Sequence, residues 1–299
     1  MTTFRISSHG RLQDWIAAEK GYFGEEGLDY ELNVVLLERS ASEDAESLER
    51  ASIERGGDVR VGASELYRAG AGGKRDMSCA CHWAVNQAAA EQHGRMWGHA
   101  YSVLPCGIYV APESEVLRPA DLAGVDVGVG YHSGSHFSAI QALESVLAPD
   151  EIKLSFVGQP YDRVDALLAR DLPAVNAWGA ATYLLEQQGF RKVLDSTFMA
   201  GFLFGAHIDA ADVEKYFNGL KRAQMDLDFE PERYKHHYLK EIPERFHELI
   251  DVRGFGTGER VVFLDYTEEM YERSQRWMRE RRLYEEEAAV PAFASVVQV

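Results

Sequence analysis

The chain has 299 residues, of which 46% are hydrophobic and 11% aromatic, a composition typical of a globular protein rather than a disordered one. Its 31 lysine and arginine residues against 48 aspartate and glutamate residues give a net charge of −17, which argues against nucleic acid and anionic membrane surfaces as partners. No apolar run approaches the roughly 20 residues that span a bilayer, so we expect no membrane insertion.

The cysteines and the N-terminus indicate a cellular compartment. Cys79, Cys81 and Cys106 form no recognisable disulfide framework, and free thiols fit a reducing environment. Residues 1–12 contain no apolar segment of the kind found in a signal peptide. We therefore expect a cytoplasmic protein, and a homodimer is one candidate assembly.

Apolar runs and helical periodicities alternate along the chain, which indicates α/β architecture. We expect strands at Phe4–Ser7, Leu28–Leu36, Val59–Val61, Met77–Val85, Ser102–Val110, Val125–Gly130, Leu154–Val157, Ala174–Ala177 and Phe202–Ile208. We expect helices at Leu12–Lys20, 38–57, 135–147, Asp162–Ala169, Tyr183–Gln188, Asp212–Met225 and from Tyr266 onward. Thr267 is placed to cap the last helix, because two carboxylates follow it in the first turn.

Residues 12–32, LQDWIAAEKGYFGEEGLDYEL, combine an amphipathic helix, a Tyr-Phe pair and two glycine turns after the first strand. This order resembles the opening of the type II periplasmic-binding-protein fold, in the branch that holds nitrate, sulfonate and taurine solute-binding proteins and the thiamine-pyrimidine synthases. Residues 115–137 resemble the entry into the second lobe of that fold, 167–190 a second-lobe strand that ends at the cleft, and 267–287 the last first-lobe helix.

The resemblance implies two lobes with a ligand cleft between them. By analogy, lobe one holds residues 1–103 and 210–299, and lobe two holds 104–209. In such folds, ligands bind where strands end and helices begin, because free backbone N–H groups point there. Five loops of this chain meet that description.

The first loop, Ser7–Arg11, joins the first strand to the first helix. Ser8 or His9 would contact a ligand, and Arg11 would pair with an anion; the alternative is that the serines only cap the helix. The biphenyl sulfinate desulfinases, which share the implied fold, carry a nucleophilic cysteine in this loop. This chain has Ser8 and His9 there, so we do not expect thiol-based desulfination of that type.

The second and third loops follow later strands. Ser64 lies in a small-residue turn and would offer a hydroxyl and an amide to a ligand, or cap a helix. In Met77–Trp83, strand alternation would put Cys79, Cys81 and Trp83 on one face and His82 on the other. That spacing is no recognised zinc motif, so we expect buried cysteines and no metal site, with His82 or Trp83 as candidates for the cleft wall.

The fourth loop, Gly128–Phe137, carries the strongest local signal. It resembles a dinucleotide fingerprint, but its third glycine comes one residue late, so we reject NAD binding. Ser133 and Ser135 at a helix N-terminus would bind a carboxylate, sulfonate or phosphate, assisted by His132 and His136. The alternative is a capped helix with solvent-facing histidines.

The fifth loop contains Asn176, which would orient a ligand, and Trp178, which would stack on it. Core packing is the alternative for both residues. Two further segments, 236–237 and 254–258, are expected to be a solvated loop and a flexible loop.

Several histidines in the expected cleft favour an enzyme over passive ligand capture. The preferred hypothesis is a cytoplasmic lyase, most plausibly a decarboxylase, for a small aromatic or heteroaromatic acid. His9 or His82 would deliver the proton, while Trp83 and Trp178 would flank the ring. The alternatives are a non-catalytic solute-binding protein of an ABC importer and a metal-dependent enzyme that uses clustered histidines. The sequence identifies no cofactor.

Overall fold

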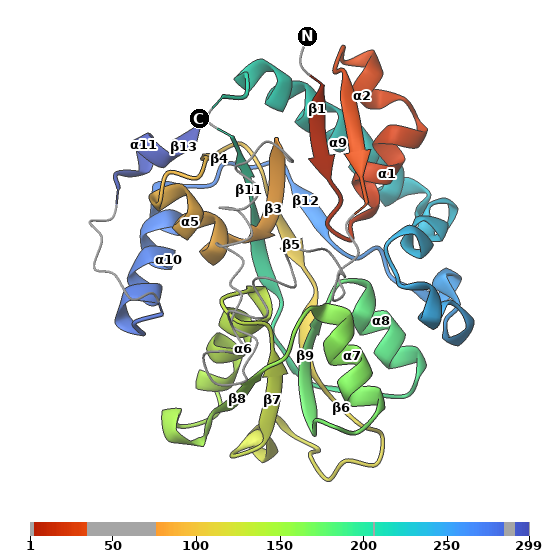
Figure 1. Cartoon of the computed structure of the whole chain (residues 1–299), viewed down its shortest axis with the longest axis vertical. Coiled ribbons are helices and arrows are strands. Elements are labelled where there is room, and N and C mark those ends of the chain that lie inside the picture. The colour runs from red at the N-terminus through yellow and green to blue at the C-terminus, as the bar shows by residue number, and fades with distance from the viewer. Residues whose placement is uncertain (1–2, 35–75, 206, 284–290, 299) are drawn as a thin grey trace, which may run out of the picture.

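The computed structural model describes residues 3–34, 76–205, 207–283 and 291–298, and it has two lobes, each built on one β-sheet (Figure 1). The expected two-lobed α/β fold is therefore confirmed. The first sheet contains β1 Phe4–Ser7, β2 Tyr30–Asn33, β3 Met77–Cys81, β4 Arg95–Trp97, β5 Tyr101–Leu104, β11 Phe198–Phe204, β12 Arg260–Val262 and β13 Val297–Gln298. Its main order is β12-β5-β11-β3-β1-β2, and β4 pairs with β11 and β13.

Helices flank the first sheet on both sides (Figure 1). On one side lie α1 Leu12–Glu19, α2 Tyr22–Glu25 and α9 Ala210–Phe229; on the other lie α5 His82–Ala90, α10 Glu268–Glu280 and α11 Phe293–Val296. The core between α2, α9 and the sheet is aromatic: the buried ring of Phe23 stacks on Tyr216 at 5.4 Å. As expected, Thr267 caps α10, because its hydroxyl accepts a hydrogen bond from the Met270 N–H.

The second lobe has a five-stranded sheet in the order β10-β6-β9-β7-β8. Its strands are β6 Cys106–Val110, β7 Asp126–Val129, β8 Lys153–Phe156, β9 Ala174–Trp178 and β10 Arg191–Asp195. Its helices are α6 Gly134–Glu144, α7 Pro160–Leu168 and α8 Ala180–Gln187. The described residues also form short 3-10 helices at η1 Pro119–Leu122, η2 Pro149–Glu151, η3 Pro231–Arg233, η4 Lys235–Lys240, η5 Glu244–Leu249 and η6 Val252–Gly254.

Among the described strands, the chain crosses between the sheets twice, and both crossings correct an expectation. The run Ser102–Val110, expected as one strand, is divided between β5 in the first sheet and β6 in the second. The return crossing lies between β10 and β11, since β11 pairs with β3 and β5 of the first sheet. The expected second-lobe range 104–209 therefore extends too far, because residues 198–204 belong to the first sheet.

A further correction concerns Met77–Val85. The strand ends at Cys81, and α5 begins at His82. The following alanine-rich residues favour a helix, which outweighs the strand preference of the aromatic and β-branched side chains. The expected helix at 38–57 and strand at 59–61 lie outside the described residues, as does the end of the strand expected at Leu28–Leu36.

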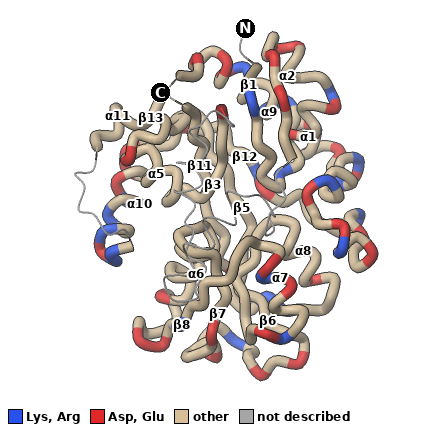
Figure 2. Tube along the Cα trace, in the orientation of Figure 1, with Lys and Arg blue, Asp and Glu red and all other residues tan. Residues whose placement is uncertain are grey.

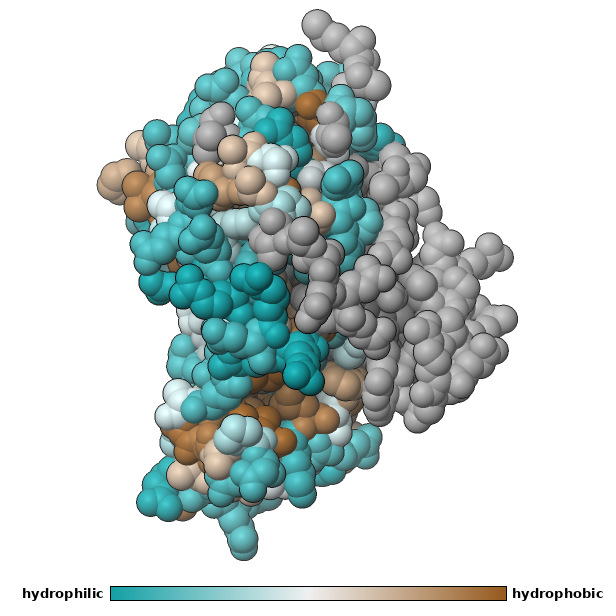
Figure 3. Space-filling view, turned by 90° about the vertical axis from the view of Figure 1, so that its left-hand side faces the viewer, coloured by the Kyte–Doolittle hydropathy of each residue, from teal (hydrophilic) through white to brown (hydrophobic). Residues whose placement is uncertain are grey.

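Charged residues of both signs are interspersed over the outer helices and loops (Figure 2). On the face that looks left in Figure 1, the first lobe is mostly hydrophilic, and hydrophobic residues gather on the second lobe (Figure 3). In the described part of the chain, no helix is both long enough and apolar enough to cross a bilayer.

Candidate functional site

A pocket lies between the two lobes. On the first-lobe side, it is bounded by the start of α1 and by η4; on the second-lobe side, by the starts of α7 and α8. Its empty space is about 380 Å³, counting the open mouth. The lining residues are Gly10, Arg11, Leu12, Trp15, Pro160, Tyr161, Trp178, Ala180, Ala181, His237, Tyr238 and Glu241.

The N-terminus of α1 is occupied by a carboxylate of the protein itself. The Gly10 N–H donates to Glu241 Oε2 at 2.6 Å, and the Trp15 indole N–H donates to Oε1 at 2.5 Å. Burial raises the pKa of Glu241 to about 6, although these hydrogen bonds favour the charged form. Glu241 thus takes the position at which a helix N-terminus favours an anion.

The N-terminus of α8 also faces the pocket. Strand β9 ends at Trp178, and Gly179, at φ 60° and ψ −140°, turns the chain into α8. The first N–H groups of a helix have no intrahelical partner, and Ala180 and Ala181 line the pocket at this position. Trp178 forms the adjacent wall, and its ring stacks on the His9 imidazole at 5.3 Å between centroids. The structure therefore brings two of the expected site residues, His9 and Trp178, together.

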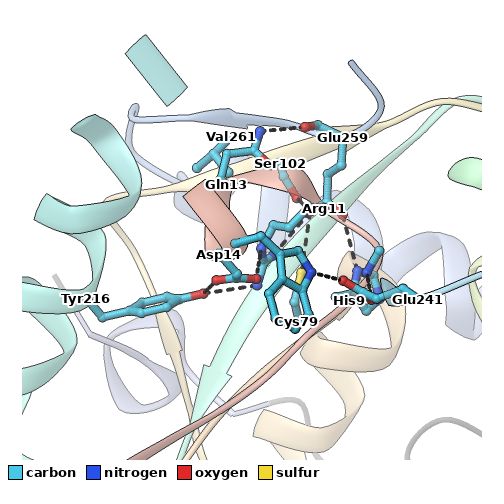
Figure 4. A network of polar contacts seen from close by, with 12 residues as sticks. His9, Arg11, Gln13, Asp14, Cys79, Ser102, Tyr216, Glu241, Glu259 and Val261 are labelled. Atoms are coloured by element: carbon cyan, nitrogen blue, oxygen red, sulfur yellow. Dashed lines mark hydrogen bonds and ion pairs between the residues drawn. The ribbon is translucent and has the colours of Figure 1, made fainter. Parts of the chain in front are cut away.

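Arg11 lines the pocket, and its guanidinium is part of a buried polar network (Figure 4). Its Nε donates to Asp14 at 2.7 Å, and its Nη2 donates to the Tyr216 hydroxyl at 3.0 Å. Its Nη1 donates to Glu259 at 3.4 Å. Two carboxylates of the first lobe therefore bind this guanidinium, whose side chain is only 1% exposed.

Glu259 links Arg11 to the loop after β1. Its Oε2 lies 3.2 Å from His9 Nδ1, and its Oε1 accepts from Ser102 and, at 3.7 Å, from the Cys79 thiol. Burial alone would raise the pKa of Glu259, but His9 and Arg11 lower it to about 2. Burial alone would lower the pKa of His9, but Cys79 and Glu259 raise it to about 10. His9 and Glu259 consequently form a charged pair at neutral pH.

The second lobe contains a buried cation that the sequence analysis missed. Arg163 of α7 is 1% exposed and donates to the backbone carbonyls of Val157, Gly158 and Asn176. Within the described residues, none of its hydrogen bonds goes to a carboxylate, in contrast to Arg11. Burial lowers the pKa of Arg163 to about 10, which still leaves the guanidinium charged at neutral pH.

The two serines expected to bind an anion at the N-terminus of α6 form hydrogen bonds within their own loop. The Ser135 hydroxyl accepts from the Gly130 N–H at 2.9 Å, and the Ser133 hydroxyl donates to the Gly130 carbonyl at 2.7 Å. The two hydroxyls also contact each other at 2.9 Å. These side chains therefore already have partners within the loop, and their role as ligand contacts stays a prediction.

The two histidines of the same loop are held close together. The His132 N–H donates to His136 Nδ1 at 3.2 Å. Burial lowers the pKa of His132 to about 4 and that of His136 to about 3, so both imidazoles are neutral at neutral pH. Neither residue lines the pocket.

The remaining expected site residues lie elsewhere. His82 contacts Ser274 of α10 at 2.9 Å, and burial lowers its pKa to about 3. Trp83 is 1% exposed and packs against Phe137 of the second lobe. The alternation expected for a strand through Trp83 ends at Cys81, so these two side chains project from a helix instead.

Asn176 is fully buried within the second lobe, where its amide donates to the Ser196 hydroxyl at 2.9 Å and accepts from the Cys106 thiol. Ser64 lies outside the described residues.

Several pocket residues were missed or misjudged from the sequence. The segment 236–237 was expected to be a solvated loop, but His237 is 2% exposed and lines the pocket with Tyr238. Glu241 and Glu259 were not singled out. Aromatic residues beside acids in an irregular segment are a weak local signal, and the partners of both carboxylates are distant in sequence.

Comparisons with known structures identify the fold. Neither a family model nor a curated protein matches the chain. The alkanesulfonate-binding protein SsuA from Xanthomonas axonopodis pv. citri, solved with MOPS bound, is 15% identical with a TM-score of 0.71, over 100% of this chain and 98% of that one. The Candida albicans CA3427 gene product, described as having the generic periplasmic binding protein fold, is 10% identical with a TM-score of 0.69, over 100% and 96%.

An enzyme is among the similar structures. The desulfurization enzyme DSZB is 14% identical with a TM-score of 0.59, over 97% of this chain and 95% of that one. At such low identities the likeness establishes architecture rather than activity. This chain has the two-lobed type II periplasmic-binding-protein fold.

Proposed function

We propose that this chain binds a small organic anion between its lobes, as a solute-binding protein does. The observation that carries the proposal is the positive character of the second-lobe side of the pocket. There, the N-terminus of α8 faces the pocket, and Arg163 is buried without a carboxylate among its hydrogen-bond partners.

The backbone at α8 suits an anionic group. Free N–H groups and the helix dipole at a helix N-terminus together favour a carboxylate, sulfonate or phosphate. The Arg163 side chain donates to the carbonyl of Asn176, two residues before Trp178 on β9, so its charge lies behind this wall of the pocket. Because buried charges are weakly screened, Arg163 would strengthen the attraction for an anion.

The rest of the pocket suits an apolar body on the ligand. Trp15, Tyr161, Trp178 and Tyr238 contribute aromatic surface from both lobes. Aromatic walls with a few placed polar groups are typical of small-molecule sites. The sulfonate-binding proteins among the similar structures support an anionic ligand of this kind.

Lyase chemistry on an aromatic acid is the second candidate. His9 favours it, because its protonated imidazole stacks on a pocket tryptophan, but its pKa of about 10 makes it a weak acid at neutral pH. The similarity to DSZB also provides an enzyme on the same fold. We place binding ahead of catalysis because the alternative proton donor, His82, contacts Ser274 of α10, and because the His9 imidazole is already paired with Glu259.

Calorimetric titration tests the proposal with three ligands of equal length: an alkyl sulfonate, the corresponding carboxylate and the neutral amide. We expect both anions to bind and the amide to bind at least about tenfold more weakly, because it lacks the charge that α8 attracts. Trp178→Ala should weaken anion binding by about tenfold or more through loss of the aromatic wall.

Phe229→Ala is the matched control, since this aromatic side chain is 81% exposed on α9 and does not line the pocket. Equal affinity for acid and amide, or equal affinity of the Trp178 variant and the wild type, would overturn the proposal.

A further inference from the structure

Three side chains with metal-binding atoms converge beside the pocket, from segments far apart in the sequence. His9 lies in the loop after β1, Cys79 in β3, and Glu259 just before β12 (Figure 4). One potential ligand atom from each residue lies within 4.8 Å of the other two. Thiolate, imidazole and carboxylate are the donors from which three-ligand zinc sites are built.

The spacing fits a tetrahedral ion. Bonds of about 2.3 Å to sulfur and about 2.1 Å to nitrogen and oxygen put tetrahedral nitrogen and oxygen ligands roughly 3.4 Å apart, and sulfur and oxygen ligands roughly 3.6 Å apart. His9 Nδ1 lies 3.2 Å from Glu259 Oε2, and Cys79 Sγ lies 3.7 Å from the other oxygen, Oε1, so the carboxylate would turn slightly or bind through both oxygens. Small side-chain adjustments would therefore allow an ion to bind.

The surrounding residues hold the carboxylate in place. Arg11 and Ser102 both donate to Glu259 Oε1, whereas Oε2 faces His9. Cys79 is 7% exposed and Glu259 is 1% exposed, so this part of the site is shielded from water. His9 is more open, at 15% side-chain exposure, and stacks on Trp178. A fourth ligand would enter on the His9 side.

We propose that His9, Cys79 and Glu259 bind one divalent transition-metal ion of the zinc class, with a fourth position open on the side of the pocket. The mixed sulfur, nitrogen and oxygen set favours zinc-like ions over magnesium or calcium, which prefer oxygen.

This inference departs from the expectation that the chain has no metal site. That expectation was based on the local Cys79-x-Cys81-His82 spacing, whereas the proposed ligands include neither Cys81 nor His82. It is also independent of the organic ligand, because the ion can be tested alone.

The experiment adds Co²⁺, as a spectroscopic substitute for zinc, to purified protein that has been treated with a chelator. We expect one equivalent to bind, with a thiolate-to-cobalt charge-transfer band in the near ultraviolet and intense visible bands of a four-coordinate ion. Zinc should remove the bands by displacing cobalt. Cys79→Ser should lose the charge-transfer band and bind zinc at least about 100-fold more weakly.

Cys81→Ser is the matched control, because Cys81 lies two residues along the same strand and is also buried. It should keep the band and bind zinc within about threefold of the wild type. Glu19, His236 and His237 form a second cluster of nitrogen and oxygen donors. The titrations are therefore repeated with H236Q protein, in which less cobalt should bind at this second cluster. That cluster cannot give a thiolate band.

Folding of Cys79→Ser is checked by near-ultraviolet circular dichroism, and zinc should raise the melting temperature of the wild type and C81S more than that of C79S. If saturating Co²⁺ gives no thiolate band with the wild type, or if the band survives in C79S, the proposal is wrong.

Discussion

The two sides of the pocket differ in how they treat buried positive charge. On the first-lobe side, the Arg11 guanidinium is neutralised by Asp14 and Glu259, and Glu241 occupies the N-terminus of α1. On the second-lobe side, Arg163 hydrogen-bonds only carbonyls among the described residues, and the N-terminus of α8 faces the pocket. The buried cation on the first-lobe side is neutralised by carboxylates, whereas we propose that the second-lobe side attracts an anionic ligand.

The largest effect is expected from a substitution on the first-lobe side of the pocket, where the buried charges are neutralised. Glu259→Gln removes the carboxylate shared by His9, Arg11 and Ser102. Removing one partner of a buried ion pair leaves the other charge uncompensated, so we expect a loss of about 3–5 kcal/mol in the free energy of unfolding. Urea denaturation measures it. Exposed Glu244→Gln, the control, should stay within about 0.5 kcal/mol of the wild type; equal losses would refute the account of the network.

A smaller effect is expected from distorting the second-lobe side of the pocket, at the N-terminus of α8. Gly179 turns β9 into α8 at φ 60°, a conformation that side chains rarely adopt. Gly179→Ala should cost about 1–3 kcal/mol in stability and weaken anion binding, because the start of α8 shifts. Gly24→Ala is the control, since Gly24 lies in α2 with nothing within 4 Å of an added Cβ. Urea denaturation measures the stability of each variant, and calorimetry measures its affinity for the anion. If the two glycine variants had the same stability and the same affinity, the proposal would be contradicted.

The charge of Arg163 can be separated from its hydrogen bonds. Arg163→Gln should weaken anion binding by about tenfold, as expected for the loss of a nearby weakly screened charge. Arg163→Lys keeps the charge without the planar fork, and should remain within about threefold of the wild type in calorimetry. If Arg163 instead acts only by holding backbone carbonyls in place, anion binding should be weakened equally in both variants.

The smallest expected effect concerns pH. Burial raises the pKa of Glu241 to about 6, so the carboxyl becomes protonated as the pH falls from 7 to 5. Repulsion of an anionic ligand then disappears, and we expect affinity to increase by about threefold to tenfold over this range. Glu241→Gln should bind with the higher affinity at pH 8 and show a flatter profile. A pH profile unchanged by the substitution would exclude Glu241 as the cause.

Much of the fold could be predicted because its signals are local. The periodicity of α1, the capping of α10 by Thr267 and the strand β1 were all visible in short windows. The run Ser102–Val110 was expected as one strand, although Pro105 interrupts it where the chain changes sheets. Residues 82–85 were wrongly expected to continue the strand, because their strand preference is weaker than the helix preference of the alanine-rich residues that follow.

Residues of the candidate site could be predicted only where they lie at or directly after the end of a strand. His9, Arg11 and Trp178 were selected because they follow strand ends, and all three lie at or beside the pocket. Glu241 meets Gly10 across 231 sequence positions, and Glu259 meets His9 across 250. Nothing local marks such partners, so the difference between a neutralised and an open side of the pocket could be found only in the folded chain.

The most direct test of the account is mass spectrometry of the protein incubated with a pool of alkyl and aromatic carboxylates, sulfonates and sulfinates. Both the retained and the released molecules would be analysed. We predict that one class of anion is retained unchanged, and that Trp178→Ala no longer retains it. Release of a compound that has lost carbon dioxide or sulfite would contradict the binding-only account and establish a lyase instead.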